Sequence, residues 1–95
     1  MSKILIISAT KGNNLSLAKK IGDYVRIDNE IISLEDFEMP LYVPKTKIIK
    51  TDEVKNLSEI FIQSKGFIFC APEYNGGSPP ILTNAITWLS VTMDN

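Results

Sequence analysis

Residues 70–90 read CAPEYNGGSPPILTNAITWLS, and this stretch predicts the end of a strand, a loop and a helix in direct succession. Its first residues close the apolar run GFIFCA, which is typical of a strand in the interior of a sheet. The loop is rich in Gly, Asn and Pro, and Pro79 or Pro80 suits the first turn of a helix. Apolar side chains then recur at helical spacing, at Ile81, Leu82, Ala85, Ile86 and Leu89.

The same order of elements occurs twice earlier in the chain. KILIIS, residues 3–8, predicts a buried strand, and NEIISL, residues 29–34, predicts another. After the first strand, Asn13 or Asn14 is placed to cap a helix whose apolar positions are Leu17, Ala18, Ile21, Tyr24 and Val25. After the second, a helix is expected to begin at Thr51, Asp52 and Glu53, and to bury Val54, Leu57 and Phe61.

This alternation of buried strands and amphipathic helices predicts an α/β fold with a parallel sheet and right-handed crossovers. With strand order 2-1-3, the loops after the first and third strands become neighbours at the carboxyl edge of the sheet. Ligands of such sheets bind at that edge, where the strand order reverses.

Length and composition limit the possible classes of protein. With 95 residues, the chain is expected to form one domain over 1–95, and its net charge of −1, with no basic stripe, argues against a nucleic-acid partner. The apolar runs are too short for a membrane span, and the start, MSKILIIS, has no signal-peptide pattern. We therefore expect a cytoplasmic protein with no membrane partner.

The chain contains one cysteine and no histidine. An internal disulfide, a Cys/His metal cluster and a Ser-His-Asp or Cys-His catalytic arrangement are therefore excluded within the chain. If the protein performs chemistry at neutral pH, we expect a bound cofactor to supply the reactive atoms.

The loop after the first strand, SATKGNNLS at residues 8–16, has the composition of an anion site. Free backbone N–H groups at the start of the following helix would favour a phosphate there. The spacing matches neither the Walker A loop nor the dinucleotide fingerprint, so an ordinary strand-to-helix turn is the alternative. The side chains that would contact a phosphate are those of Ser8, Thr10, Lys11, Asn13, Asn14 and Ser16.

The loop after the third strand closely resembles the NADPH-dependent FMN reductase family, flavodoxin-like proteins that include quinone, azo-dye and chromate reductases. The family pattern is Pro-Glu-Tyr-Asn-Gly-Ser, a proline two residues later, and Leu-Lys-Asn-Ala-Ile-Asp-Trp-Leu-Ser. This chain departs from it at Gly77, Thr83 and Thr87. Weaker resemblance extends to ILIISAT and LEDFEMPLY. The matching residues are Pro72, Glu73, Tyr74, Asn75, Gly76, Pro79, Leu82, Asn84, Ala85, Ile86, Trp88, Leu89 and Ser90.

The resemblance implies an FMN site between the two loops, with NADPH or NADH as co-substrate and a quinone-like or other small molecule as electron acceptor. It implies that Pro72, Glu73, Tyr74, Asn75 and Gly76 run along the isoalloxazine ring. Family members often have Gly-Ser-x-Arg in the first loop, where this chain has no arginine. The implied phosphate-side residues are Ser8, Thr10, Lys11, Asn13, Asn14, Leu15 and Ser16.

The resemblance also implies a flavodoxin-like three-layer sandwich, whose full sheet has five strands in the order 2-1-3-4-5. Only the first three are predicted here, so the chain is expected to be truncated, the N-terminal half with strands four and five missing. The third strand would then be an apolar edge, which favours a homo-oligomer, most simply a dimer.

Several alternatives stay open at this point. The chain could be a flavodoxin-like electron carrier or a non-catalytic remnant and assembly module of the same fold. Glu73 is more simply a surface carboxylate than an acid or base, so no catalytic residue is assigned. Tyr74 could contact a second subunit instead of flavin, and Cys70 is expected to be a buried, inert thiol. Residues 39–42 could line a substrate mouth, contact a partner subunit or cover the sheet.

Overall fold

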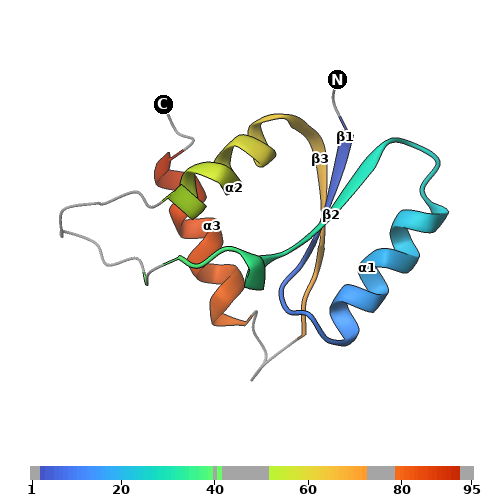
Figure 1. The fold of residues 1–95 in the computed structure, drawn as a ribbon, viewed down its shortest axis with the longest axis horizontal. Coiled ribbons are helices and arrows are strands. Elements are labelled where there is room, and N and C mark those ends of the chain that lie inside the picture. The colour runs from blue at the N-terminus through green and yellow to red at the C-terminus, as the bar shows by residue number, and fades with distance from the viewer. Residues whose placement is uncertain (1–2, 40, 42–51, 73–78, 93–95) are drawn as a thin grey trace.

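The computed structural model describes residues 3–39, 41, 52–72 and 79–92, and these form an α/β fold (Figure 1). β1 (Lys3–Ser8), β2 (Asn29–Ser33) and β3 (Ser64–Cys70) build one sheet. The helices are α1 (Asn13–Tyr24), the short 3-10 helix η1 (Leu34–Asp36), α2 (Asp52–Ile62) and α3 (Pro80–Thr92). The alternation of strands and helices expected from the sequence is therefore confirmed.

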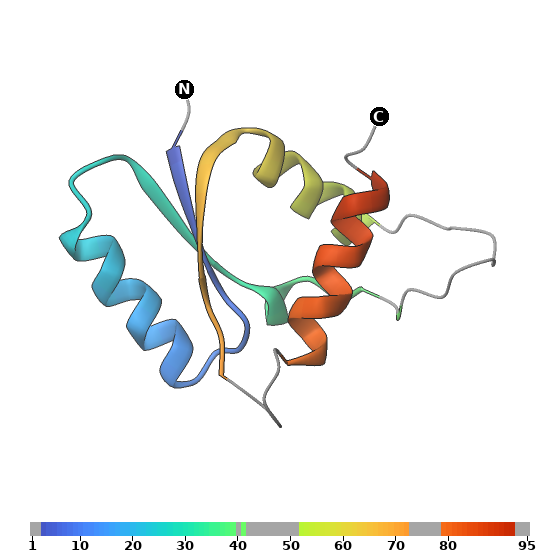
Figure 2. The same ribbon diagram turned by 180° about the vertical axis from the view of Figure 1, so that it is seen from behind.

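The sheet is parallel and has the order β2-β1-β3, as predicted. Ile6 at the centre of β1 lies opposite Ile31 of β2 on one side and Ile68 of β3 on the other. Helix α1 lies on one face of the sheet, and α2 and α3 lie on the opposite face (Figures 1 and 2). This three-layer arrangement is flavodoxin-like.

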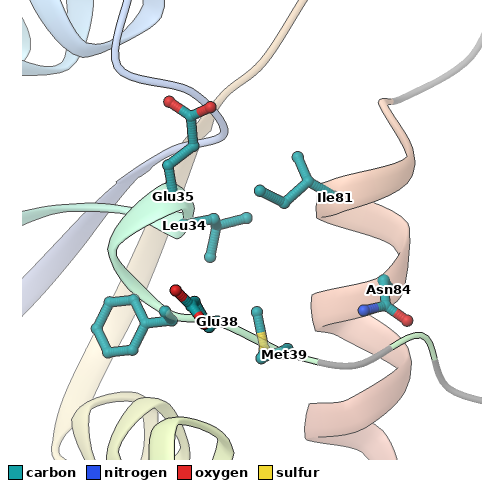
Figure 3. Close-up of a pocket in the computed structure, with 7 residues that line it drawn as sticks. Leu34, Glu35, Glu38, Met39, Ile81 and Asn84 are labelled. Carbon is teal, nitrogen blue, oxygen red and sulfur yellow. The ribbon is translucent and has the colours of Figure 1, made fainter.

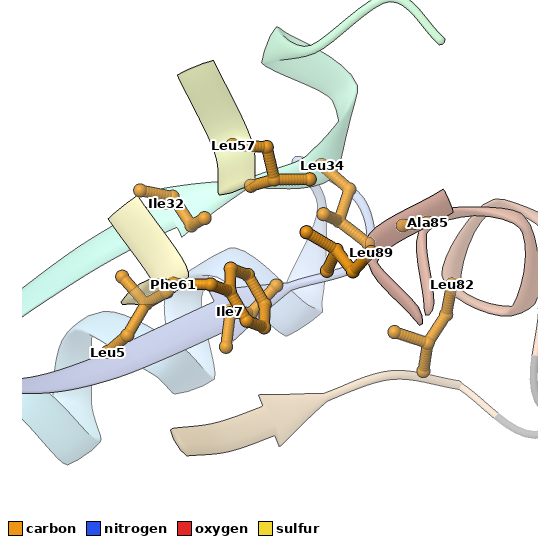
Figure 4. Close-up of a cluster of buried hydrophobic side chains, with 9 residues drawn as sticks. All are labelled: Leu5, Ile7, Ile32, Leu34, Leu57, Phe61, Leu82, Ala85 and Leu89. Carbon is orange, nitrogen blue, oxygen red and sulfur yellow. The ribbon is translucent and has the colours of Figure 1, made fainter. Parts of the chain in front are cut away.

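Strand β1 is buried on both faces because its side chains alternate between two cores. Ile6 belongs to the core under α1, together with Ala18 and Cys70. Leu5 and Ile7 belong to the larger core under α2 and α3 (Figure 4). Each such buried Leu or Ile stabilises the fold by roughly 1.5–3 kcal/mol. The larger core consists of Leu5, Ile7, Ile32, Leu34, Leu57, Phe61, Leu82, Ala85 and Leu89.

The start of α1 differs from the expectation of an asparagine cap. Gly12 occupies the N-cap position, and its carbonyl oxygen accepts the N–H groups of Leu15 at 3.1 Å and Ser16 at 3.3 Å. Asn13 and Asn14 therefore lie inside the first turn. The side-chain amide of Asn14 donates to Oγ1 of Thr10 at 3.4 Å instead of capping the helix.

Two helical faces also differ from the predicted ones. On α1, Ala18 is buried, whereas Leu17 is 49% and Tyr24 is 86% exposed. On α3, Ile86 is 48% exposed while Trp88 is buried. Helical spacing allows either residue on the buried face, because Trp88 is three residues from Ala85 and Ile86 is three residues from Leu89. The packing of α3 buries Trp88 and leaves Ile86 half-exposed.

The other differences concern element ends. β3 begins at Ser64, two residues before the predicted start at Gly66, and Leu34 belongs to η1 instead of β2. Among the described residues, no helix combines the length and the apolar composition needed to cross a bilayer.

Candidate functional site at the carboxyl edge of the sheet

The carboxyl ends of the three strands lie side by side. Ser8, the last residue of β1, is in register with Ser33 of β2 and with Cys70 of β3. Immediately beyond, the N–H of Ala9 donates to the carbonyl oxygen of Cys70 at 2.9 Å. The loops after β1 and β3 therefore start from neighbouring, hydrogen-bonded positions, as the strand order predicts.

The loop after β1 is held by its own polar groups. Ser8 is fully buried and its hydroxyl donates to the carbonyl oxygen of Thr10. The Asn14 side chain contacts the Thr10 hydroxyl. These contacts fix the loop between the sheet and α1. The backbone N–H groups of Asn13 and Asn14 have no acceptor within the helix and lie at the positive end of its dipole.

Two acidic side chains of η1 contact this loop. Oε1 of Glu35 accepts the backbone N–H of Lys11 at 2.7 Å, and Oδ1 of Asp36 lies 2.6 Å from Nζ of Lys11. The hydroxyl of Ser33 accepts the N–H of Glu35 at 3.2 Å, and the N–H of Phe37 donates to the carbonyl oxygen of Leu34 at 3.1 Å. The backbone of η1 is thereby anchored next to the loop.

The hydrogen bond and the charge of Asp36 raise the pKa of Lys11, and the charge of Glu35 makes a smaller contribution in the same direction. The Lys11 side chain is therefore protonated at neutral pH, but its ammonium group is paired with the Asp36 carboxylate. Both side chains are more than half exposed to solvent, so the ion pair is screened by water and salt.

A pocket of about 300 Å³ lies between η1 with its following residues and α3 (Figure 3). Its walls are largely apolar, from Leu34, Phe37, Met39 and Ile81, with polar groups from Glu35, Glu38 and Asn84. Glu35 thus lines the pocket while its carboxylate contacts the loop after β1. The pocket and the loop after β1 are therefore adjacent at the carboxyl edge of the sheet.

Residues 39–42, expected to line a substrate mouth, contact a partner subunit or cover the sheet, do not share one environment. Met39 packs against the larger core and lines this pocket, whereas Leu41 is 76% exposed. Pro40 and Tyr42 lie outside the described residues.

The structure brings together most of the first predicted set. Ser8, Thr10 and Asn14 are joined by hydrogen bonds within the loop, and Lys11 is tied to η1. Asn13 and Ser16 are exposed on the first turn of α1, and Leu15 is half-buried. Their roles in phosphate binding stay predictions.

Of the second predicted set, Pro72 is half-buried and follows Ala71 at the end of β3. The other four residues of this set, Glu73, Tyr74, Asn75 and Gly76, lie outside the described residues. Cys70 is buried, and desolvation raises the pKa of its thiol, which favours the unreactive protonated form.

Sequence reasoning missed Glu35 and Asp36 as members of this site. A signal was present, because both residues directly follow the second strand, whose carboxyl end lies at the same edge as the first loop. Hydroxyls, amides and lysine are the groups that bind anions, so acidic residues were not expected beside them.

The donor set of the loop fits a phosphomonoester. The free N–H groups of the first turn of α1 and the exposed polar side chains of Asn13 and Ser16 can all donate to phosphate oxygens. The N–H of Lys11 is already used by Glu35, so an anion would have to share or displace that contact.

The model of the NADPH-dependent FMN reductase family matches residues 2–95, nearly the whole chain. Searches of curated proteins and of solved structures found no match. The match agrees with the parallel sheet of order β2-β1-β3 and with the polar loop after β1 at the carboxyl edge of that sheet. This chain therefore belongs to the NADPH-dependent FMN reductase family, which supports a flavin-dependent NAD(P)H reductase function in general terms.

Proposed function

We propose that the protein binds FMN at the carboxyl edge of the sheet and transfers hydride from NADPH or NADH to a small acceptor such as a quinone. The observation that carries this proposal is the hydrogen bond from Ala9 to the carbonyl oxygen of Cys70. It joins the bases of the two loops that, in this family, are expected to hold the two ends of the flavin.

The loop after β1 would hold the phosphate. In this proposal, the N–H groups of Asn13 and Asn14 and the side chains of Asn13 and Ser16 donate to its oxygens. Ser8 and Thr10 act indirectly, because their hydrogen bonds keep the loop in shape. The helix dipole of α1 adds a favourable partial charge for the anion.

The loop that begins at Pro72 would hold the ring, with Glu73, Tyr74, Asn75 and Gly76 along it. FMN, when bound, supplies the group that accepts and donates hydride. The protein's part is to bind and orient the flavin and to shield it from water. No side chain of this chain is proposed as an acid or base, and a cytoplasmic location, where NADPH and NADH are available, belongs to the same proposal.

We also propose that two copies of the chain associate through the edge of β3. Within the described sheet β3 pairs with β1 alone, so one row of its backbone groups faces outward. Phe67 and Phe69, on one face of this edge, are 42% and 44% exposed. In an antiparallel pair centred on Ile68, Phe67 of each copy lies opposite Phe69 of the other, so the edge is self-complementary.

A titration of the purified protein with FMN, followed by quenching of flavin fluorescence, tests the flavin site. Saturation near one FMN per chain, followed by bleaching of the bound flavin on addition of NADPH or NADH, is the expected result. Stoichiometric FMN without reduction by either nucleotide would favour an electron carrier. Absence of binding at FMN concentrations of hundreds of micromolar would overturn the proposal and favour a non-catalytic module of this fold.

A further inference from the structure

We infer that Glu35 competes with the phosphate of FMN for the loop after β1, and so lowers the affinity of the site for phosphorylated flavin. This inference rests on the proposed function, and it concerns a residue outside the predicted binding set. The relevant contact is the 2.7 Å hydrogen bond from the backbone N–H of Lys11 to Oε1 of Glu35.

A carboxylate is itself an anion. One N–H donor of the loop after β1 is therefore already hydrogen-bonded to a negatively charged group. Hydrogen bonds from a neutral donor to an ionised acceptor are stronger than neutral pairs. A phosphate oxygen that approaches the same N–H must displace Glu35 or do without that donor.

The neighbouring charges reinforce the competition. Lys11 is the cation of this loop, and its ammonium group lies 2.6 Å from Asp36. Glu35, Asp36 and Lys11 together carry a net charge of −1 beside the first turn of α1. A phosphomonoester is largely dianionic at neutral pH, so it meets repulsion that the lysine does not cancel.

Glu35 is presented to the loop by its backbone, because Ser33 accepts the Glu35 N–H at 3.2 Å at the start of η1. Its side chain extends from η1 towards the loop at one end of the pocket, and the side chain of Ile81 lies across from it (Figure 3). The contact with Lys11 is solvent-exposed. The carboxylate can therefore move away when an anion binds, at a cost that appears in the binding constant.

The test compares FMN with riboflavin, which has the same ring and no phosphate. Dissociation constants for both are measured by fluorescence quenching at one ionic strength, for the wild type, Glu35→Gln and Glu35→Ala. We expect both variants to bind FMN about three- to tenfold more tightly, the range expected when one screened like charge is removed. Riboflavin affinity should change by less than about twofold, because the charge acts on the phosphate.

Glu38→Gln is the matched control. It removes the same charge from a residue that lines the same pocket, but no contact joins it to the loop within the described part of the chain. Its FMN affinity should stay within about twofold of the wild type, since the Glu38 carboxylate takes up no donor of the loop after β1 and water and salt screen its charge. An equal gain in Glu38→Gln, or unchanged or weaker FMN binding in both Glu35 variants, would overturn the inference.

Failure of the proposed function gives a different pattern, in which neither flavin binds to any variant. The competition is then measured with inorganic phosphate, by following the backbone amide resonances of Lys11 and Gly12. Tighter phosphate binding in Glu35→Gln than in the wild type would uphold the role of Glu35 without flavin. Equal or undetectable binding in both proteins would overturn it.

Discussion

The rings of Phe61 on α2 and Phe67 on β3 stack, with their centroids 4.8 Å apart and their planes inclined by 18°. Phe61 is 7% exposed and Phe67 is 42% exposed, so the pair connects the larger core to the outer edge of the sheet. Phe69 lies beside them, with its ring centroid 6.4 Å from that of Phe61.

Phe61→Ala should therefore cost much more stability than Phe67→Ala. Truncation of a buried phenylalanine leaves a cavity, and we expect the free energy of unfolding to fall by about 3 kcal/mol or more. For the half-exposed Phe67 a loss of about 1 kcal/mol is expected. Urea denaturation measures both, and Phe61→Leu serves as a milder variant if Phe61→Ala does not fold. Equal losses at the two positions would contradict this assignment of core and edge.

The β3 edge predicts an oligomeric state that depends on concentration. In sedimentation experiments, the wild type should move from monomer to dimer as concentration rises, and Phe67→Lys combined with Phe69→Lys should remain monomeric because paired lysines repel. Leu17→Lys, which adds charge at a half-exposed position on the other face of the sheet, should leave dimerisation unchanged. A wild type that is monomeric at every concentration would rule out this interface.

Cys70 predicts a pH dependence of stability. Burial raises the pKa of its thiol in the folded protein, so the folded chain keeps a proton that the unfolded chain loses. This contribution is complete below the ordinary thiol pKa, about 8.5, and is lost as the pH rises from there towards the folded value. The stability difference between wild type and Cys70→Ala should shrink over that range. A constant difference would show that the thiol titrates alike in both states.

The same burial predicts slow modification of Cys70. A thiol-specific reagent should react with the native protein far more slowly than with the protein in denaturant, because access and thiolate formation are both restricted. Equal rates in the two conditions would mean that the end of β3 opens readily.

Asp36→Asn tests the ion pair of the loop. The pKa of Lys11 is raised chiefly by its hydrogen bond to Asp36, so the variant should lower it towards the ordinary lysine value. NMR titration of the Lys11 side chain measures the change, and Glu38→Gln should leave it unaltered. The freed ammonium group should also favour phosphate, so FMN affinity should increase; a decrease would show that the ion pair supports the loop in its binding conformation.

The fold was largely predictable because each strand is a compact apolar run. KILIIS matches β1 residue for residue, since the polar residues Lys3 and Ser8 stand at the two ends of its apolar run. The strand order 2-1-3 was expected from the resemblance to flavodoxin-like proteins and not from connection length, because the link from β2 to β3 passes over β1. The ends of the strands were harder to predict. Leu34 is apolar and was expected to extend β2, but the Ser33 side chain caps the 3-10 helix η1, which begins at Leu34.

The site was predictable only in its location. The hydroxyls and amides of the first loop are close together in the sequence, so Ser8, Thr10 and Asn14 could be grouped by their positions in the chain alone. The contact between Lys11 and Glu35 joins residues 24 positions apart and depends on how η1 leaves the sheet. No local pattern encodes that approach. Ile86 and Trp88 show the same limit, since spacing alone does not tell which of two nearby apolar residues faces the core.

The hydrogen bond between Ala9 and Cys70 also has a dynamic consequence. Because one backbone bond closes the base of both loops, neither loop base can open by itself without exposing the other. Hydrogen exchange at the Ala9 amide would thus report the opening of the whole edge as a single event. A bound flavin that spans both loops should slow that exchange, whichever loop contributes more of the binding energy.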